Sequence, residues 1–240
     1  SVSYQPIISL HSGETVAVEA LARWNDNKLG SISPATFIPI AEESGLIGEL
    51  GRLVLQTAIA QASVWNKAGE SETLMTINLS NRQLLDPELI PAISSLLDEH
   101  GLDPRLLCFE ISESVVMSDV AASMTLLGRM KDLGLRLAID NFGTGYSSLS
   151  YLRRLPVDIL KIDQTFVAEL GPSSGGHTVA AATCQIAETL GIDVVAEGVE
   201  TYEQAAALAD MGVDLVQGFL FSVPLTAPEA GLVDRCVPGG

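Results

Sequence analysis

The stretch SYQPIISLHSGETVAVEAL, residues 3–21, decides how the first two predicted strands pair. Residues 3–10 and 16–21 are both apolar and typical of strands, and only HSGET, residues 11–15, separates them. A parallel crossover needs on the order of a dozen residues, so two strands this close in the sequence should pair antiparallel. We therefore predict a hairpin that turns at Gly13.

Six further apolar segments predict strands, and helical patterns lie between most of them. The strand segments are residues 74–79, 106–111, 136–140, 159–162, 193–196 and 215–217. Most are rich in Val, Ile and Leu without strict alternation, which is typical of strands buried on both faces. The clearest helical patterns cover residues 50–65, 88–99, 120–133, 178–190 and 202–211. This alternation predicts an α/β fold, a modified (β/α)8 barrel of the TIM type whose first strand is reversed.

Length and charge indicate one acidic domain. The chain has 240 residues, of which 47% are hydrophobic, and 30 acidic residues against 13 Lys and Arg give a formal net charge of −17. Such a field repels polyanions, so we expect no DNA or RNA polymer as a partner. No apolar run reaches the ~18 residues of a membrane span, so we expect no direct membrane insertion. We interpret residues 1–240 as a single domain excised from a longer multidomain signalling protein.

The cysteines favour a reducing compartment. Cys108, Cys184 and Cys236 are widely spaced, odd in number, and form neither a disulfide framework nor a metal-binding motif. Cys108 lies in an apolar segment and is expected to be a buried thiol. Together with the lack of a signal peptide, this predicts a cytoplasmic domain, in a full-length protein that other segments could tether to a membrane.

Polar side chains close the predicted strands. They are Glu19, Asn78, Glu110, Glu113, Asp140, Lys161, Asp163, Glu197, Glu200 and Gln217. In a parallel barrel the carboxyl ends of the strands converge on one face, which carries the active site. We therefore expect these side chains to line a single bowl.

The acids of this bowl predict a metal site. Seven carboxylates would face Lys161 and Arg23, and each close pair of like charges costs ~1–4 kcal/mol. Carboxylates with one Asn carbonyl are ligands for Mg²⁺, Mn²⁺ or Ca²⁺ rather than for zinc. Taken singly, each acid could instead be solvated or cap a helix: Asp163 could cap the next turn, and Glu200 could lie in the first turn of a helix. That alternative does not explain seven strands in a row.

Eight short motifs occur along the chain in a definite order. They are YQPI (4–7), EALAR (19–23), NLS (78–80), EISES (110–114), DNFGTGYSSLSYL (140–152), LPVDILKID (155–163), AEGVE (196–200) and QGF (217–219). Their order and spacing resemble those of the EAL domain family over essentially the whole chain. The resemblance implies a modified (β/α)8 barrel with a reversed strand, in agreement with the hairpin, and hydrolysis of cyclic di-GMP to linear pGpG with Mg²⁺ or Mn²⁺.

The resemblance also implies roles for individual residues. It implies metal ligation by Glu19, Asn78, Glu110, Asp140, Asn141 and Glu197, in a two-metal site that Ca²⁺ would inhibit. It implies catalytic roles for Glu19, Lys161, Glu197 and Glu113, with Lys161 holding the attacking water and Glu113 bracing the loop after the fifth strand. It implies substrate-side roles for Gln5, Arg23, Glu200 and Gln217, and a homodimer contact through a helix within residues 146–154.

Residue 141 departs from the family pattern, which has two adjacent aspartates. Here Asp140 is followed by Asn141, a neutral carbonyl where a carboxylate normally helps the second metal, so that site should be weakened. Two hypotheses remain: a working phosphodiesterase, and a receptor that binds cyclic di-GMP without cutting it. The other family residues are all present, which favours the enzyme.

Overall fold

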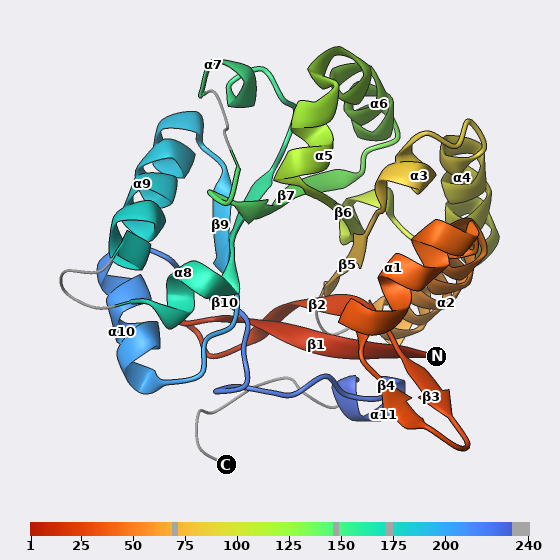
Figure 1. Cartoon of the computed structure of the whole chain (residues 1–240), viewed down its shortest axis with the longest axis horizontal. Coiled ribbons are helices and arrows are strands. Elements are labelled where there is room, and N and C mark those ends of the chain that lie inside the picture. Colours follow the sequence, from red (N-terminus) through yellow and green to blue (C-terminus); the bar gives the residue numbers. More distant parts are fainter. Residues whose placement is uncertain (69–71, 146–148, 171–174, 232–240) are drawn as a thin grey trace.

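Eight strands of the computed structural model form a closed barrel (Figure 1). The structure describes residues 1–68, 72–145, 149–170 and 175–231. Around the barrel the strands follow the order β1-β10-β9-β8-β7-β6-β5-β2. Their bounds are β1 Val2–Ser9, β2 Thr15–Ala22, β5 Leu74–Asn78, β6 Leu107–Ser112, β7 Arg136–Phe142, β8 Ile159–Ile162, β9 Asp193–Ala196 and β10 Leu215–Val216. The predicted fold class is confirmed.

Strand β1 is the reversed strand. It pairs antiparallel with both β2 and β10, whereas the other neighbours around the barrel pair parallel. The turn from β1 to β2 places Gly13 at a φ of 72°, a left-handed conformation that glycine adopts without steric cost, and its N–H donates to the carbonyl of Ser9 at 2.8 Å. The short connection therefore forms the predicted hairpin.

Five of the helices outside the barrel were predicted (Figure 1). They are α2 Ile47–Ala68, α4 Leu89–His100, α6 Val120–Asp132, α9 Gly175–Leu190 and α10 Tyr202–Asp210. On α2 the predicted apolar face packs inward, with Val54, Ala58 and Ala62 buried in the main hydrophobic core. Within the part of the chain described, no helix is long and apolar enough to cross a membrane.

The remaining helices and strands were mostly not predicted. They are the hairpin β3 Trp24–Asp26 and β4 Gly30–Ile32, with α1 Pro34–Ser44, α3 Asn81–Leu84, the 3-10 helix Pro104–Leu106, α5 Glu113–Ser118, α8 Gln164–Ala168 and α11 Ala227–Ala230. Helix α7, Leu149–Leu152, does lie within the short helix expected at residues 146–154, of which 146–148 are outside the described residues. Most of these elements are too short to show a period, and α1 carries Pro39 inside it, a residue that normally ends a helix.

The barrel interior has two layers. The layer nearer the amino ends of the parallel strands, which we call the apolar layer, consists of Ile7, Ala17, Leu74, Cys108, Ala138, Ile159 and Val195. Because alternate residues of a strand share a face, the residues two positions further on also point inward. On five strands these are Glu19, Glu110, Asp140, Lys161 and Glu197, which we call the polar layer. Cys108 is buried with a free thiol, as predicted, and burial raises the pKa of that thiol.

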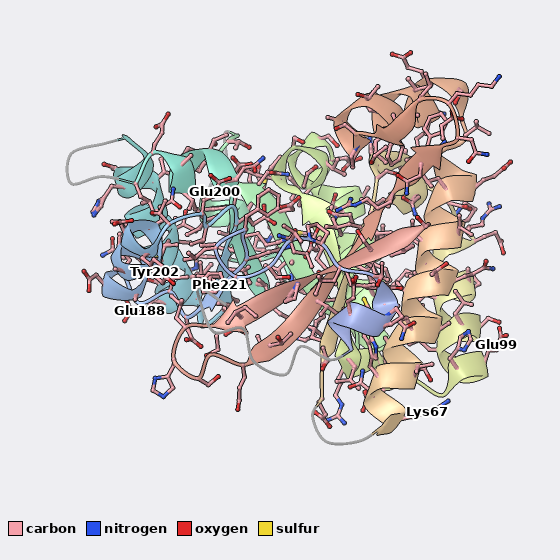
Figure 2. All side chains as sticks on the ribbon, turned by 90° about the horizontal axis from the view of Figure 1, so that it is seen from below. Lys67, Glu99, Glu188, Glu200, Tyr202 and Phe221 are labelled. Atoms are coloured by element: carbon pink, nitrogen blue, oxygen red, sulfur yellow. The ribbon has the colours of Figure 1, made fainter. Side chains whose placement is uncertain are left out.

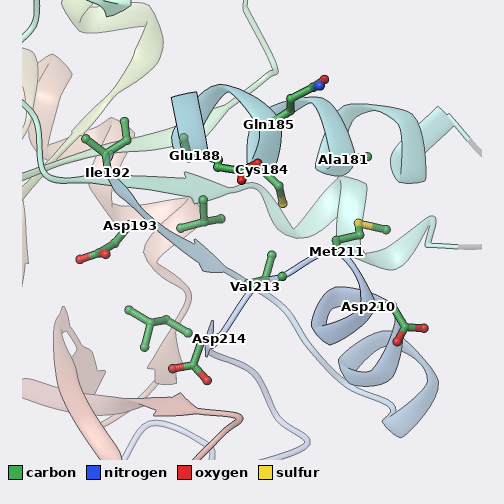
Figure 3. Close-up of a pocket in the computed structure, with 14 residues that line it drawn as sticks. Ala181, Cys184, Gln185, Glu188, Ile192, Asp193, Asp210, Met211, Val213 and Asp214 are labelled. Carbon is green, nitrogen blue, oxygen red and sulfur yellow. The ribbon is translucent and has the colours of Figure 1, made fainter. Parts of the chain in front are cut away.

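A hollow of about 980 Å³ lies beside the amino ends of β9 and β10 (Figure 3). Its walls are the second half of α9, the start of β9 and the segment from the end of α10 to β10. Asp193, Asp210 and Asp214 line it, together with apolar side chains such as Val213. None of the predicted site residues lines it.

Candidate metal centre

Lys161 lies at the centre of the polar layer. Its Nζ is 2.6 Å from Glu110 Oε2, 2.5 Å from Glu197 Oε1 and 3.5 Å from Glu19 Oε2. The side chains of Lys161 and Glu110 are each only 1% exposed. Three carboxylates from widely separated parts of the sequence therefore meet around one buried ammonium group.

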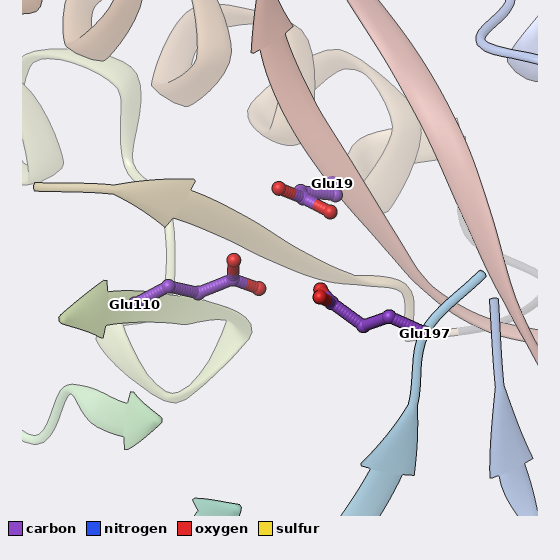
Figure 4. A group of neighbouring side chains, drawn as sticks. All are labelled: Glu19, Glu110 and Glu197. Carbon is purple, nitrogen blue, oxygen red and sulfur yellow. The ribbon is translucent and has the colours of Figure 1, made fainter. Parts of the chain in front are cut away.

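The three glutamates could also hold a metal ion. One oxygen from each of Glu19, Glu110 and Glu197 lies within 4.8 Å of the others, and the three side chains converge on a common space (Figure 4). Asp140 adds a fourth carboxylate whose charge acts on Lys161 and Glu19. Four carboxylates against one ammonium leave an excess of three negative charges when all are ionised, and divalent cations with oxygen ligands would compensate them.

This excess of negative charge shifts the pKa values of the acids in the cluster. Burial raises the pKa of Glu110 well above its ordinary value, and the neighbouring charge of Glu19 raises it further. Burial raises the pKa of Glu197 to about 7, although Lys161 opposes the shift. Burial also raises the pKa of Asp140. Without metal, the cluster therefore retains protons near neutral pH, and bound cations would replace them.

Glu19 behaves differently from the other acids. Burial alone would raise its pKa, but the Lys161 ammonium and hydrogen bonds from Gln217 and Asn78 lower it below the ordinary value. Burial would lower the pKa of Lys161, but the charges of Glu110, Glu19 and Glu197 raise it well above the ordinary value. Glu19 and Lys161 thus form the ionised pair around which the cluster is organised.

The hydrogen bonds of Glu19 support a hydrated metal ion as the missing partner. Asn78 Nδ2 donates to Glu19 Oε1 at 2.6 Å, and Gln217 Nε2 donates to Glu19 Oε2 at 2.8 Å. The other end of the Gln217 amide, Oε1, is buried and accepts no hydrogen bond from the described protein atoms. A buried acceptor beside carboxylates fits a donor such as a metal-bound water. The residues present therefore fit the expected metal centre.

A β-bulge in β7 sets the direction of the Asp140 side chain. Ile139 pairs with Leu160 and Phe142 pairs with Ile162, so β7 has one residue more than β8 over this interval. Within the bulge, Asn141 has a φ of 55° and is, among the described residues, the non-glycine residue with a positive φ. Asparagine is one of the few side chains that tolerate this left-handed conformation. Bulges of this kind occur next to active sites, where they redirect a side chain.

Asn141 holds the carboxylate of Asp140 from both ends. Its backbone N–H donates to Asp140 Oδ1 at 2.8 Å, and its side-chain Nδ2 donates to Asp140 Oδ2 at 2.9 Å. The Asn141 side chain is thus a hydrogen-bond donor to the neighbouring acid, and its role as a metal ligand stays a prediction.

The comparisons with known proteins agree with this geometry. The EAL domain family model matches residues 1–224. The chain belongs to the EAL domain family. Two curated relatives from Pseudomonas aeruginosa are similar to it: the bifunctional diguanylate cyclase/cyclic di-GMP phosphodiesterase MucR, 39% identical over 226 residues, and the cyclic di-GMP phosphodiesterase NbdA, 40% identical over 222 residues.

The matches cover most of this chain but only a minor part of each curated relative. The matches include 94% and 92% of this chain but 33% and 28% of MucR and NbdA, so the chain spans about a third of the length of these relatives. A solved structure, the PaMucR phosphodiesterase in complex with c-di-GMP, superposes with a TM-score of 0.93 at 38% identity. That match covers 96% of this chain and 93% of the other.

The EAL domain braces the loop after β7 through Glu113. This side chain is 1% exposed, and its Oε2 accepts the N–H of Gly143 at 2.8 Å and that of Gly145 at 3.4 Å. Gly143 has a φ of 95°, and a Cβ on Gly145 would lie 2.9 Å from Glu113 Oε1. Both glycines are therefore needed for the loop to approach Glu113 this closely, which is the contact that the family resemblance implied.

The other predicted residues of the EAL domain fall in different places. Gln5 is buried, pairs in register with Glu19 and donates to the carbonyl of Ser222 at 3.2 Å. Arg23 lines a cavity of about 340 Å³ beside Asn78. Burial lowers the pKa of Arg23, against the opposing charge of Glu19. Both Gln5 and Arg23 thus lie close to the metal centre.

Two acids at strand ends are not part of the cluster. Asp163 caps α8, where its Oδ1 accepts the backbone N–H of Thr165 at 2.8 Å, so the simpler alternative considered for it is confirmed. Glu200, labelled in Figure 2, is exposed just before the N-cap residue of α10. Nothing in the described structure brings Glu200 into contact with the polar layer.

Sequence reasoning missed two features of the site. Helix α1 contributes Pro34, Ile38 and Glu42 to the cavity beside Arg23, and no periodic pattern marked this helix. Thr76 points into the barrel between Leu74 and Asn78 on β5. Strict alternation along β5 would have placed it there, because Asn78, two residues further on, was already expected in the bowl.

Proposed function

We propose that this EAL domain hydrolyses cyclic di-GMP to linear pGpG with Mg²⁺ or Mn²⁺ as cofactor. The observation that carries the proposal is the convergence of Glu19, Glu110 and Glu197 around Lys161. MucR and NbdA are named as cyclic di-GMP phosphodiesterases, and the PaMucR phosphodiesterase was solved in complex with c-di-GMP. These similarities support the same substrate for this domain.

We assign the metal ligands from the donor set of the bowl. Glu19, Asn78, Glu110 and Asp140 would hold the first ion, and Glu197 would bind the second. When bound, divalent cations lower the pKa of a water ligand and screen the phosphate charge. The buried Oε1 of Gln217 would accept a hydrogen bond from a metal-bound water.

The remaining residues position the reacting groups. Lys161 pairs with the carboxylates of Glu110 and Glu197 and compensates part of their charge, and by the family resemblance it would also hold the attacking water. Glu113 fixes the loop after β7 through the N–H of Gly143. The cavity beside Arg23 offers room for the anionic dinucleotide, with the guanidinium group available to a phosphate.

A receptor is the second candidate function. The amide of Asn141 donates to Asp140, and a neutral donor in this place offers the second metal less than a carboxylate would. A domain with only one well-held metal would bind cyclic di-GMP and release it uncut. The complete set of buried glutamates supports the enzyme over this alternative.

Product analysis distinguishes the two functions. The protein would be incubated with cyclic di-GMP and Mg²⁺ or Mn²⁺, and the products separated by chromatography, with Glu19→Gln as a control of matched size. Accumulation of pGpG by the wild type and its loss in the variant would support the enzyme. Binding without cleavage, with cleavage gained by Asn141→Asp, would support the receptor instead. No binding and no cleavage would contradict both.

We also propose, from the family resemblance, that α7 contributes to a homodimer in the cytoplasm. Tyr151 on this helix is 43% exposed, whereas Leu152 is buried against the barrel. The adjoining residues 146–148 lie outside the described residues. Light scattering at high protein concentration tests the dimer, and a monomer under those conditions would count against it.

A further inference from the structure

A cavity of about 110 Å³ lies inside the barrel beneath the metal centre. Its polar lining comes from Thr76, Glu110, Arg136 and Lys161, and residues of the apolar layer form most of the remainder. Arg136 stands at the amino end of β7, where its Nη2 pairs with Asp193 Oδ2 at 2.9 Å. The volume exceeds the roughly 10–15 Å³ that one water requires.

Thr76, which lines this cavity, has a buried hydroxyl without a described protein partner. The residue is 2% exposed, and its Oγ1 has no hydrogen-bond partner among the protein atoms described. In the register of the barrel Thr76 lies between Glu19 of β2 and Cys108 of β6. Buried polar atoms in folded proteins are almost always paired, with ordered water where no protein group is available.

The lining offers a water the number of partners that it needs. A buried water makes about three hydrogen bonds, and a site that supplies two to four polar groups is wet whereas a purely apolar cavity stays dry. Besides Thr76, the residues that line the cavity include Glu110, Lys161 and Arg136, each of which has polar atoms to offer. A dry cavity would leave the hydroxyl unpaired beside these charges.

We propose that ordered water fills this cavity, and that Thr76 is a positioning residue which acts through that water on Glu110 and Lys161. Glu110 and Lys161 face the metal centre on one side and this cavity on the other. Water held by Thr76 would therefore contact Glu110 and Lys161 on the side opposite the metal centre. The effect on the metal centre rests on the proposed function; the presence of the water does not.

Two variants test the water without any assay of turnover. Thr76→Val keeps the shape of the side chain and removes the hydroxyl, and Thr76→Ser keeps the hydroxyl. If the hydroxyl bonds to water, Thr76→Val lowers the melting temperature by about 2–4 °C and Thr76→Ser lowers it less. If the cavity is dry, Thr76→Val removes an unpaired buried group and the melting temperature stays constant or rises, which overturns the proposal.

A crystal structure and a metal titration complete the test. Electron density for water within hydrogen-bond distance of Thr76 Oγ1 is expected, and an empty cavity at high resolution overturns the proposal. Binding of Mn²⁺ followed by electron paramagnetic resonance should weaken roughly tenfold in Thr76→Val and recover in Thr76→Ser. Equal Mn²⁺ affinity in both variants overturns the positioning role. If the wild type binds no Mn²⁺, the proposed function fails, while the density and melting results still decide whether the water is present.

Discussion

Two layers of one barrel interior, two residues apart on each strand, have opposite chemistry. On β8 Ile159 belongs to the apolar layer and Lys161 to the polar layer, and on β6 Cys108 and Glu110 are related in the same way. The apolar layer stabilises the fold by burying carbon. The polar layer buries charges whose desolvation costs several kcal/mol per ion even after pairing. The inward-facing residues of the same strands thus form the hydrophobic scaffold in the apolar layer and the candidate site in the polar layer.

The largest effect is expected when the polar layer loses its central cation. Lys161→Met leaves Glu19, Glu110 and Glu197 without their shared partner, so the free energy of unfolding without metal should fall by about 3–5 kcal/mol at pH 8. The loss should shrink at pH 5, where protons compensate the acids. Urea unfolding in EDTA at both pH values measures this, and turnover of cyclic di-GMP should be lost.

Lys131→Met is the matched control for that variant. Lys131 pairs with Asp158 at 2.8 Å, but their side chains are 33% and 26% exposed. Its removal should cost about 1 kcal/mol or less and leave turnover unchanged. Equal losses of stability in the two variants would contradict the distinction between a central and a peripheral ion pair.

A larger cavity in the apolar layer should affect stability more than chemistry. Ile159→Ala removes buried carbon from beneath Lys161, and the free energy of unfolding should fall by about 2–4 kcal/mol. Because Ile159 lines the cavity beneath Lys161, turnover per folded molecule should fall, but far less than in Lys161→Met, at a temperature where the variant is folded. A variant that keeps its stability but loses turnover would show that the two layers are not separable.

The sequence was informative wherever chain length or alternation left few choices. The connection from residue 11 to residue 15 is too short for a crossover, so the reversed strand followed directly. Strand ends such as Glu19 and Glu110 were found because a closed barrel brings them together. Sequence alone could not locate α1, whose Pro39 hides the helix, nor the φ of Asn141, which depends on the bulge against β8. Glu200 lies on the surface before α10, and its substrate-side role stays a prediction.

The pH dependence of stability should follow the acids of the polar layer whose pKa values are raised. The pKa of Glu197 rises from an ordinary value of 4.5 to about 7, so the folded protein binds more protons than the unfolded chain between these values. Its contribution to stability is complete below pH 4.5 and is lost as the pH rises through 7. The raised pKa values of Glu110 and Asp140 act in the same direction.

Urea unfolding of the metal-free protein from pH 5.5 to pH 8.5 measures this trend. The free energy of unfolding should fall by roughly 1–3 kcal/mol over the range, since one pKa unit corresponds to about 1.4 kcal/mol. The lowered pKa of Glu19 acts only below its ordinary value, and the raised pKa of Lys161 only above 10.5, so neither enters this window. Saturating Mg²⁺ should abolish the decline, because it takes the place of the protons. A flat profile without metal would mean that the acids are less crowded than their distances indicate.

The smallest effect is expected at Asn141, where backbone and side chain can be tested separately. Asn141→Ala forces a left-handed φ on a residue that resists it and should cost about 1–2 kcal/mol in urea unfolding. Asn141→Gly accepts that φ and should cost less, but it removes the amide that donates to Asp140 Oδ2. If the amide orients Asp140 for metal binding, Asn141→Gly should lose turnover while it keeps most of its stability. If turnover in Asn141→Gly equals that of the wild type, the bulge alone aims Asp140, and the asparagine at this position is there for its backbone.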